Sequence, residues 1–477
     1  MFRAIAGKEI RNHLLSFRFQ AVFVLLLVLL PATVLVLSND AVRKQTEASE
    51  RQASVERYLA SYAHFNRLQN VIEPSEPPLP VHAMVRGLSD DVNMEAFDND
   101  PLPVIFPLID LTFIVAVLLS LAALILSYDA VCGEKEDGTL KLVLANGVPR
   151  STVILGKIAG GVATLLIPFL IALAASLLII LASPRLGWSG PEWIALGLIT
   201  AGSAVYLTLF YSLGVLISAR HQTGASSIMT ALFVWVLAVL VLPNLSPYAA
   251  SLLSPAPSAI KVGREVQRLT DVDRDALGNK LSGEKRAVVL KEYPVLTGIE
   301  RMSEADIKAV IGRDPDFARA YDLWRQAGAA GWNEANSIQN AKADALRDDL
   351  RRKEEAQTRL SVAISSASPM AAFTYLSADA SGTGLRGQTH FGELSAAWDQ
   401  AYGAYLRRKI AELQKAEPTR DVWNTPVNVS DMPRFVFRPE AASERIKGVW
   451  VPFLLLAGLG LSLFAAAYAS FVRYDVR

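Results

Sequence analysis

The sequence feature that most constrains the fold is a run without charged residues, "IAGGVATLLIPFLIALAASLLIIL", at residues 158–181. A bilayer core of roughly 30 Å requires about 20 apolar residues of helix, and this run exceeds that length. A core helix or strand of a soluble domain is not expected to continue this far without a charge. Hydrophobic residues make up 52% of the chain and charged residues 19%. The sequence therefore predicts an integral membrane protein.

Six apolar segments are long enough to cross a membrane: 19–37, 108–127, 158–181, 193–218, 227–245 and 449–471. The first could instead be a cleaved signal peptide, but about 20 residues precede its apolar centre and no small-x-small site follows "VLVLSND". The predicted fold class is an all-α membrane protein with six transmembrane helices and a large, mainly helical extracytoplasmic domain.

Lys and Arg residues in the short flanking segments predict the orientation. They are frequent in segments 1–18 and 128–157 and recur in the tail 472–477, whereas the loop between the third and fourth segments has only Arg185. Both termini are therefore expected in the cytosol. Segments 38–107 and 246–447 would then lie on the other side of the membrane.

The two long outer segments have the composition of a soluble domain. Apolar residues recur three and four positions apart in the first of them, which predicts one helical stripe continuing from the first span and ending at "EPSEPPLP". The stripe consists of Val55, Tyr58, Leu59, Tyr62, Phe65, Leu68 and Ile72. The second segment contains long charged helical stretches, at 314–366 and 391–415. We expect them to pack with the stripe in one helical domain rather than to form a ligand-binding sheet.

The sequence lacks the residues that several classes of function require. A formal charge of +1, from 47 basic and 46 acidic residues, gives no basic excess for a nucleic-acid partner. Five scattered histidines and the lone Cys132 predict neither a metal site nor a disulfide. The G-x-x-x-x-G-K-[ST], H-E-x-x-H and G-x-S-x-G motifs do not occur, and Ser258 with Lys261 shares only one spacing with a nucleophile pair. We therefore expect no catalytic, cofactor-binding or metal-binding residues in this chain, which is not predicted to be an enzyme.

The cytosolic loop 128–157 has more chemistry than a simple turn. A charged cluster at 134–137 is followed by Gly138, which can supply an unusual backbone angle. Thr139 is a candidate N-cap for the short apolar helix "LKLVLA", which stops at Asn-Gly 146–147 before Pro149. A short helix held at the membrane face by two turns suits docking into a groove of a partner protein.

The stretch "EKEDGTLKLVLANGVPRSTVILGK" resembles the signature of the type-2 ABC transporter permease family. Its elements are an acid-rich stretch, Gly-Thr-Leu, a short hydrophobic helix, Pro-Arg-Ser at 149–151, and Gly-Lys opening the next span. The opening segment 2–30 is similar to the elbow helix that leads to the first span in that family. The segment around "SPMAAFTYLSADASGTG" and the tail "SFVRYDVR" resemble a subgroup whose large outer insert has no assigned function. The resemblance covers nearly the whole chain.

The resemblance implies which residues couple the permease to an ATPase. They are Glu9 on the elbow helix, the loop residues Glu134, Glu136, Gly138, Thr139, Leu140 and Pro149, and Lys157 at the opening of the third span. The alternative is that the acidic run is only a solvated face. The resemblance also implies the partners: a separate ATP-binding cassette subunit that binds the ATP, and a second permease copy or a sister permease. It places the chain in the bacterial cytoplasmic (inner) membrane, with no cofactor of its own.

Asp110 is the one acid that lies inside an apolar segment near its outer end. Such an acid is a candidate for a substrate path, but a turn from the interface it can equally have a water or tertiary partner. The aromatic residues Tyr206, Phe210, Tyr211 and Trp235 could line a conduit or pack in the core.

The predicted function is the permease subunit of an ATP-driven ABC transporter, an exporter by this interpretation. The alternative is a membrane-anchored sensor or tethering protein whose outer domain binds a ligand. An ion-driven secondary transporter would need inverted repeats or charges at mid-membrane, and the sequence shows neither.

Overall fold

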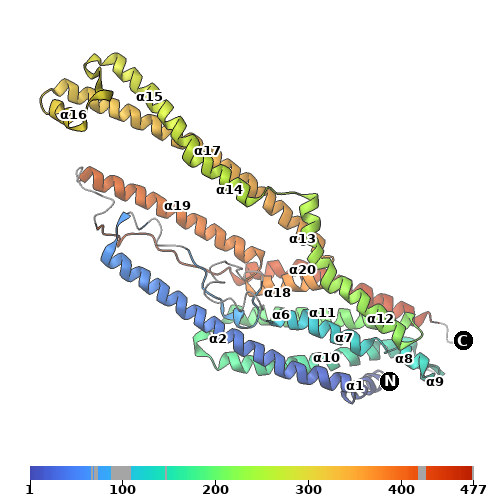
Figure 1. Ribbon diagram of the computed structural model, residues 1–477. Coiled ribbons are helices and arrows are strands. Elements are labelled where there is room, and N and C mark those ends of the chain that lie inside the picture. The colour runs from blue at the N-terminus through green and yellow to red at the C-terminus, as the bar shows by residue number, and fades with distance from the viewer. Residues whose placement is uncertain (66–67, 69–73, 88–108, 146–147, 417–425, 475–477) are drawn as a thin grey trace. The chain divides into compact units, whose positions relative to one another are not determined.

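The computed structural model describes residues 1–477 except 66–67, 69–73, 88–108, 146–147, 417–425 and 475–477. Within the described ranges the regular structure is entirely helical. The chain divides into two compact units (Figure 1). One combines Met1–Pro243 with Ser365–Arg477, and the other is Asn244–Ile364.

Six helical stretches among the described residues are long and apolar enough to cross a membrane. They are Phe17–Ala60 within α2 (Phe17–Tyr62), Leu111–Glu136 from α6 to α8, Arg150–Leu181 (α10), Gly190–Arg220 (α11), Gly224–Leu253 (α12 and α13) and Ala442–Val472 (α20). The prediction of an all-helical, multi-pass membrane protein is confirmed. The helices extend beyond the predicted segments because polar residues continue the helix outside the apolar stretch.

Two of these stretches are built from several elements. Leu111–Glu136 contains α6 (Leu111–Phe113), η2 (Ile114–Leu119), α7 (Ser120–Ser127) and α8 (Cys132–Glu136), and Gly224–Leu253 contains α12 (Gly224–Trp235) and η4 (Val236–Val241) before α13. The other elements of the first unit are α1 (Phe2–Leu14), η1 (Pro80–Ala83), α9 (Thr139–Ala145), η3 (Pro184–Leu186), α18 (Pro369–Ser381) and α19 (Leu385–Ala416). Residues at helix starts explain several boundaries. Ser16 accepts a hydrogen bond from the Phe19 amide, and Ser189 forms a capping box with Glu192 before α11.

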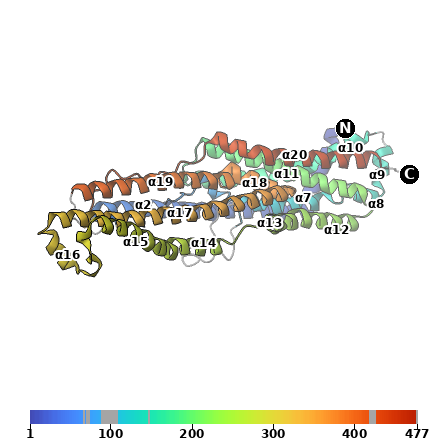
Figure 2. The ribbon, with the colours of Figure 1, turned by 90° about the horizontal axis from the view of Figure 1, so that it is seen from above.

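The core of the first unit lies where α11 packs along α20 and α18, with α10 packed on α1 and α2 (Figure 2). The aromatic residues Tyr206, Phe210 and Tyr211 are fully buried, and Trp235 is 7% exposed. Tyr206 stacks on Phe373 of α18 with ring centroids 4.9 Å apart. These contacts support the packing interpretation of the four aromatic residues.

Helix α18 packs against the candidate spans although it is not one of them. Nearly all its side chains are buried, and Leu376 lies against Gly202 of α11 so closely that a Cβ there would be 2.7 Å from it. Ser368, the N-cap, donates a hydrogen bond to the Ala238 carbonyl oxygen at 2.5 Å. The sequence prediction had grouped this helix with the rest of the segment 246–447.

Two spans contain a π-helical segment: η2 lies in Leu111–Glu136 and η4 in Gly224–Leu253. Helix α18 contacts both segments. Ser120 follows η2 directly and Trp235 precedes η4 directly, and the indole Nε1 donates to the Ser120 hydroxyl at 2.9 Å. Tyr206 donates its hydroxyl to the Ala116 carbonyl oxygen of η2 at 2.8 Å. The Ala116 carbonyl oxygen also accepts from the Ser120 hydroxyl at 2.6 Å, so Trp235, Ser120, Ala116 and Tyr206 form one hydrogen-bonded network between three spans.

The predicted apolar stripe is not carried by one helix. Helix α2 ends at Tyr62 and Ala63 is extended, so Leu59 lies on α2 whereas Phe65 and Leu68 follow it. The stripe packs on α19 and the segment 426–435. Leu59, Phe65 and Leu68 share a cluster with Trp398, Tyr402 and Tyr405, and Tyr402 donates its hydroxyl to the Leu68 carbonyl oxygen at 2.7 Å. The predicted packing of the stripe on the second outer segment is thus confirmed for α19. Ile72 lies outside the described residues, as does the side chain of Tyr62.

The second unit consists of α13 (Leu242–Leu253) from Asn244 onward, α14 (Ala259–Arg268), η5 (Leu269–Asp273), α15 (Arg274–Glu292), η6 (Pro294–Leu296), η7 (Ile299–Arg301), α16 (Glu304–Ile311) and α17 (Pro315–Ser365) up to Ile364. Glycines bring α15 and α17 together: a Cβ on Gly331 would be 2.5 Å from the backbone nitrogen of Ser282. An apolar cluster of Leu296, Ile299 and Phe317 closes the end of this unit at α16.

Candidate functional site

Helix α1 lies unusually close to α10 because two glycines of α10 face it. A Cβ on Gly156 would be 2.8 Å from the Ile5 side chain, and one on Gly160 would be 2.8 Å from the Ala6 carbonyl oxygen. Only residues without a side chain allow this approach, as in other Gly-x-x-x-Gly contacts between helices in membranes. The contact therefore fixes the elbow helix against the third span.

A buried ion cluster lies beside this contact. The Lys157 Nζ of α10 is 2.5 Å from the Glu9 Oε1 of α1 and 3.0 Å from the Glu134 Oε1 of α8. Lys157 is 3% exposed and Glu9 8% exposed. A buried ammonium is tolerated only when opposite charges surround it. One lysine thus joins three helices that are distant in sequence.

Two further side chains adjust the charge of this cluster. Lys8 lies 3.7 Å from Glu134, and His13 lies 4.0 Å from Glu9. Burial lowers the pKa of the His13 imidazole, against the opposing effect of the Glu9 carboxylate. His13 is thereby biased toward its neutral form, and the two lysines carry the positive charge of the cluster.

Helix α8 also binds the turn between α11 and α12. The Lys135 Nζ donates to the carbonyl oxygens of Ala219 and His221 at 2.6 and 3.1 Å, which are the last carbonyls of α11. The Glu136 Oε2 accepts a hydrogen bond from the Gly224 amide at 3.1 Å, at the start of α12. The lysine lies at the C-terminal end of α11, which favours a positive charge, and the glutamate lies at the N-terminal end of α12, which favours a negative charge.

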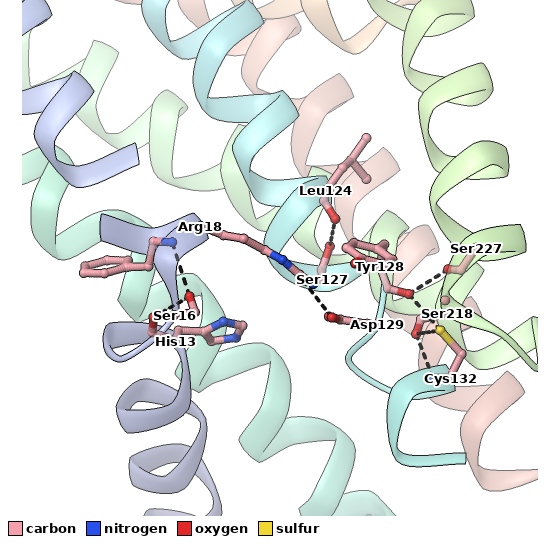
Figure 3. Close-up of polar contacts among 12 residues, drawn as sticks. His13, Ser16, Arg18, Leu124, Ser127, Tyr128, Asp129, Cys132, Ser218 and Ser227 are labelled. Atoms are coloured by element: carbon pink, nitrogen blue, oxygen red, sulfur yellow. Dashed lines mark hydrogen bonds and ion pairs between the residues drawn. The ribbon is translucent and has the colours of Figure 1, made fainter. Parts of the chain in front are cut away.

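A second set of polar contacts ties the residues before α8 to the same region (Figure 3). Arg18 at the start of α2 forms an ion pair with Asp129 at 2.7 Å. The hydroxyl of Ser218 accepts from the backbone amide of Cys132 at 3.0 Å, and the Ser227 hydroxyl donates to the Tyr128 carbonyl oxygen at 2.7 Å. The loop is therefore bonded to α2, α11 and α12.

The short helix α9 presents a different surface. Gly138 has φ +69°, which is the unusual backbone angle expected of it. Thr139 is the first residue of α9 rather than its N-cap as predicted, and its hydroxyl donates to the Glu134 carbonyl oxygen at 3.4 Å. Leu140 is 2% exposed, whereas Leu142 is 67% exposed. Lys141 is also exposed. Among the described side chains of α9, Leu142 is the large apolar one and Lys141 the charged one that a partner protein can reach.

Pro149 precedes the first residue of α10, as predicted, and Asn-Gly 146–147 lies outside the described residues. The Arg150 guanidinium donates to the carbonyl oxygens of Val472 and Tyr474, at 2.6 and 2.8 Å. The end of α20 is thus tied to the start of the third span.

Asp110 lies apart from this site and acts as the N-cap of α6. Its Oδ1 accepts from the Phe113 amide at 2.7 Å, and its Oδ2 from the Arg86 amide at 3.3 Å. Both carboxylate oxygens have backbone partners, which favours the tertiary-partner alternative over the substrate path.

Of the residues predicted from the family signature, the structure brings Glu9, Glu134 and Lys157 into one cluster. It places Glu136 at the α11–α12 turn instead, and buries Leu140. Sequence reasoning missed the roles of Lys135, Gly156 and Gly160. The four-residue spacing of the two glycines was the one signal that could have found the α1–α10 contact.

A family described as "ABC-2 family transporter protein" matches residues 3–476. The chain belongs to the ABC-2 transporter family. The prediction made from the loop signature is confirmed over nearly the full chain. ABC permeases of this kind lack an ATPase site and work with an ATP-binding subunit, which agrees with the prediction that this chain is not itself an enzyme.

Two relatives are similar to part of this ABC-2 family chain. "Probable ABC transporter permease protein NosY" of Pseudomonas aeruginosa is 33% identical over 131 residues, which cover 28% of this chain and 48% of the relative. The protein of the same name from Stutzerimonas stutzeri is 33% identical over 124 residues, 26% of this chain and 45% of the relative. The chain thus spans about half the length of the curated relatives it matches.

Proposed function

We propose that this chain is the permease subunit of an ATP-driven exporter and that α8 and α9 couple it to a separate ATP-binding subunit. The observation that supports this most strongly is the Lys157 cluster, which joins α8 to α1 and α10 through buried ion pairs. ATP would be bound by the partner. The ATP-binding partner is inferred from the family. The contacts of α8 give the route by which motion of that partner would reach the spans.

In this proposal the exposed side of α9 docks into the ATP-binding subunit. Leu142 would fill an apolar groove and Lys141 would meet an acidic rim, since both are accessible. The buried Leu140 holds α9 to the permease core. An apolar residue anchored in a groove and ringed by charge is a common arrangement at interfaces.

Displacement of α9 would be transmitted by α8. Lys157 links α8 to α10, and Lys135 and Glu136 link it to the ends of α11 and α12. The candidate span that ends in α8 and three further spans, α10, α11 and the one that begins with α12, therefore receive the motion directly. The predicted coupling roles of Glu134 and Glu136 become positioning roles here: they hold α8 while α9 touches the partner.

The proposal includes the predicted topology. Both termini and the loop 128–157 would be cytosolic in the bacterial inner membrane, and segments 38–107 and 246–447 would form the large extracytoplasmic domain. A second permease copy or a sister permease would complete the transporter. A protease site inserted at the exposed Gly298, where the φ of +88° marks a turn, should be cut only from the outer side. Cleavage there from the cytosolic side of sealed vesicles would reject this topology.

The coupling surface can be tested with Leu142→Glu, alone and combined with Lys141→Glu. We expect co-purification with the ATP-binding subunit and stimulation of its ATPase to fall at least tenfold, equivalent to about 1.4 kcal/mol. Lys308→Glu is the matched control, because Lys308 is an exposed lysine of α16, far along the chain. If the α9 variants assemble and stimulate like the parent, α9 is not the coupling helix, and the sensor or tether alternative gains support.

A further inference from the structure

An apolar groove of about 570 Å³ lies between α10 and α11. It has no role in the coupling route described above. Its lining consists of Leu166, Leu170, Leu173, Ala174 and Leu177 of α10, and Trp193, Leu196, Gly197, Thr200, Ala201 and Ala204 of α11. Its volume is within the range of small-molecule sites, roughly 300–1,000 Å³.

The lining disfavours a polar ligand. The only hydroxyl in it belongs to Thr200, and that hydroxyl already donates to the Leu196 carbonyl oxygen at 2.7 Å. No lining residue carries a charge. The other polar side-chain group in the lining is the indole N–H of Trp193. A ligand with several hydrogen-bonding groups would therefore lose more hydration than these partners replace. The lining favours a hydrocarbon chain.

The position of the groove identifies which hydrocarbon. Both walls are candidate membrane spans, so the groove lies at the level of the bilayer core. Along α10 it runs from Leu166 to Leu177, which at 1.5 Å per residue is roughly 16 Å. That length is close to half of a bilayer core of about 30 Å. It fits one acyl chain of a single leaflet.

The end of the groove nearest the α10–α11 connection has the features of a membrane interface. Trp193 packs edge-to-face with Trp188, with ring centroids 5.5 Å apart, and Arg185 is exposed in the same connection. Tryptophan rings favour the headgroup level, and an arginine there can bind a phosphate. An apolar channel with aromatic rings and a cation at one end matches an amphiphile with an anionic head.

We propose that the α10–α11 groove binds one acyl chain of a bilayer phospholipid from the leaflet on the side of the α10–α11 connection, with its phosphate near Arg185. The lipid fills a space whose lining disfavours water and polar solutes. It also supports the separation of α10 from α11 along the part of the third span that lies beyond the α1 contact.

Filling the groove tests this proposal. No heavy atom lies within 4 Å of a Cβ built on Gly197, so the ring of Gly197→Phe enters the groove without displacing its walls. Gly458→Phe is the matched control: Gly458 of α20 is also an exposed glycine of a candidate span with nothing within 4 Å of a Cβ. Native mass spectrometry of the full chain, purified from vesicles of phosphatidylglycerol and phosphatidylethanolamine, counts the phospholipids retained.

We expect the parent and Gly458→Phe to retain one phospholipid per chain. In Gly197→Phe the fraction of chains that retain this lipid should fall at least tenfold. Arg185→Glu should reduce retention of phosphatidylglycerol more than twofold. Equal retention by Gly197→Phe and the parent overturns the proposal. The buried Cys132 is the only cysteine, so Ala201→Cys adds one reactive thiol at the groove. Efficient disulfide-linked dimers of Ala201→Cys in the membrane would show that a second copy occupies the groove, which also overturns it.

Discussion

The molecule buries polar groups in two regions by opposite means. At the α1–α8–α10 junction, one ammonium lies between two carboxylates, with Lys157 2.5 Å from Glu9. Within the spans, at the two π-helical segments, the buried groups are neutral: the Trp235 indole, the Ser120 hydroxyl and a backbone carbonyl. The first region joins helix ends, and the second joins helix interiors.

The difference follows from how the cost of burial depends on charge. Removing one ion from water costs several kcal/mol even after relaxation, so buried charges require close opposite charges on every side. A neutral donor with one acceptor costs far less to bury, and its net contribution is about 1 kcal/mol. Removing one member of the ionic region is therefore expected to lower the stability of the protein strongly. Removing one member of the neutral region should lower it only weakly.

The largest expected effect is that of Lys157→Met. It leaves the buried Glu9 carboxylate and the partly buried Glu134 carboxylate without their shared cation, and only the exposed Lys8 remains beside Glu134. Breaking a buried pair in this way typically costs about 3–5 kcal/mol. We expect a clear fall in the apparent melting temperature of the purified protein and loss of ATPase stimulation.

Two controls isolate the charge. Lys141→Met removes an exposed lysine of α9 and should leave the melting temperature unchanged. Adding Glu9→Gln and Glu134→Gln to Lys157→Met should restore most of the stability, because no buried uncompensated charge then remains and the charge of Lys8, which loses Glu134, is exposed. A triple variant as unstable as the single one would show that the lysine acts through packing instead.

The close approach that holds the ionic region can be broken without touching a charge. Gly160→Leu places a side chain where a Cβ would already be 2.8 Å from the Ala6 carbonyl oxygen, and such overpacking typically costs about 1–3 kcal/mol. The matched control is Gly7→Ala on α1, where nothing lies within 4 Å of a Cβ. A melting temperature equal to that of the parent for Gly160→Leu would mean that α1 can detach from α10 without loss.

Asp379 of α18 gives a third case, a half-buried carboxyl that forms no ion pair with a cation among the described residues. Among the described residues Arg386 pairs instead with Glu440 and Glu444, at 3.8 and 3.5 Å. Burial raises the pKa of Asp379 to about 6, with Arg386 opposing the shift. The folded state thus binds the proton more tightly than the unfolded state does. The stabilisation is present below about pH 4 and is lost as the pH rises through about 6.

Asp379→Asn should therefore match the parent at pH 4 and exceed its stability at pH 8 by roughly 2 kcal/mol, allowing for solvent screening of a partly exposed group. Melting temperatures of the two proteins between pH 4 and pH 8 measure this directly. A difference that stays constant across that range would contradict the assignment.

The sequence predicts the parts of this structure that depend on local pattern. Apolar length predicted the six spans, and periodicity predicted the apolar stripe that packs on α19, although α2 ends at Tyr62 before the last residues of the stripe. Gly138 has an unusual backbone angle, as its residue type allowed. The family signature predicted Glu9, Glu134 and Lys157 as site residues. It did not predict that they pair with one another, because that pairing depends on how α1 crosses α10.

The parts that sequence could not predict depend on tertiary packing. Helix α18 has the composition of a short outer helix, but Ala371, Phe373 and Leu376 are buried against the spans. The π-helical segments have no sequence signature, because a π-turn arises where packing favours one extra residue in the turn. Glu136 was expected at a partner surface, and its bond to the Gly224 amide requires the fold of the α11–α12 turn.

The smallest expected effect is that of Trp235→Phe, which tests the neutral region. It removes the indole donor to Ser120 while keeping an aromatic ring in a site that is 7% exposed. Loss of a neutral hydrogen bond of this kind costs about 1 kcal/mol, well below the cost expected for Lys157→Met. Ser120→Ala should cost somewhat more, because it leaves the indole nitrogen buried without its acceptor. If Trp235→Phe destabilises the protein as much as Lys157→Met does, the neutral network contributes as much stability as the ionic cluster, and the contrast between the two regions fails.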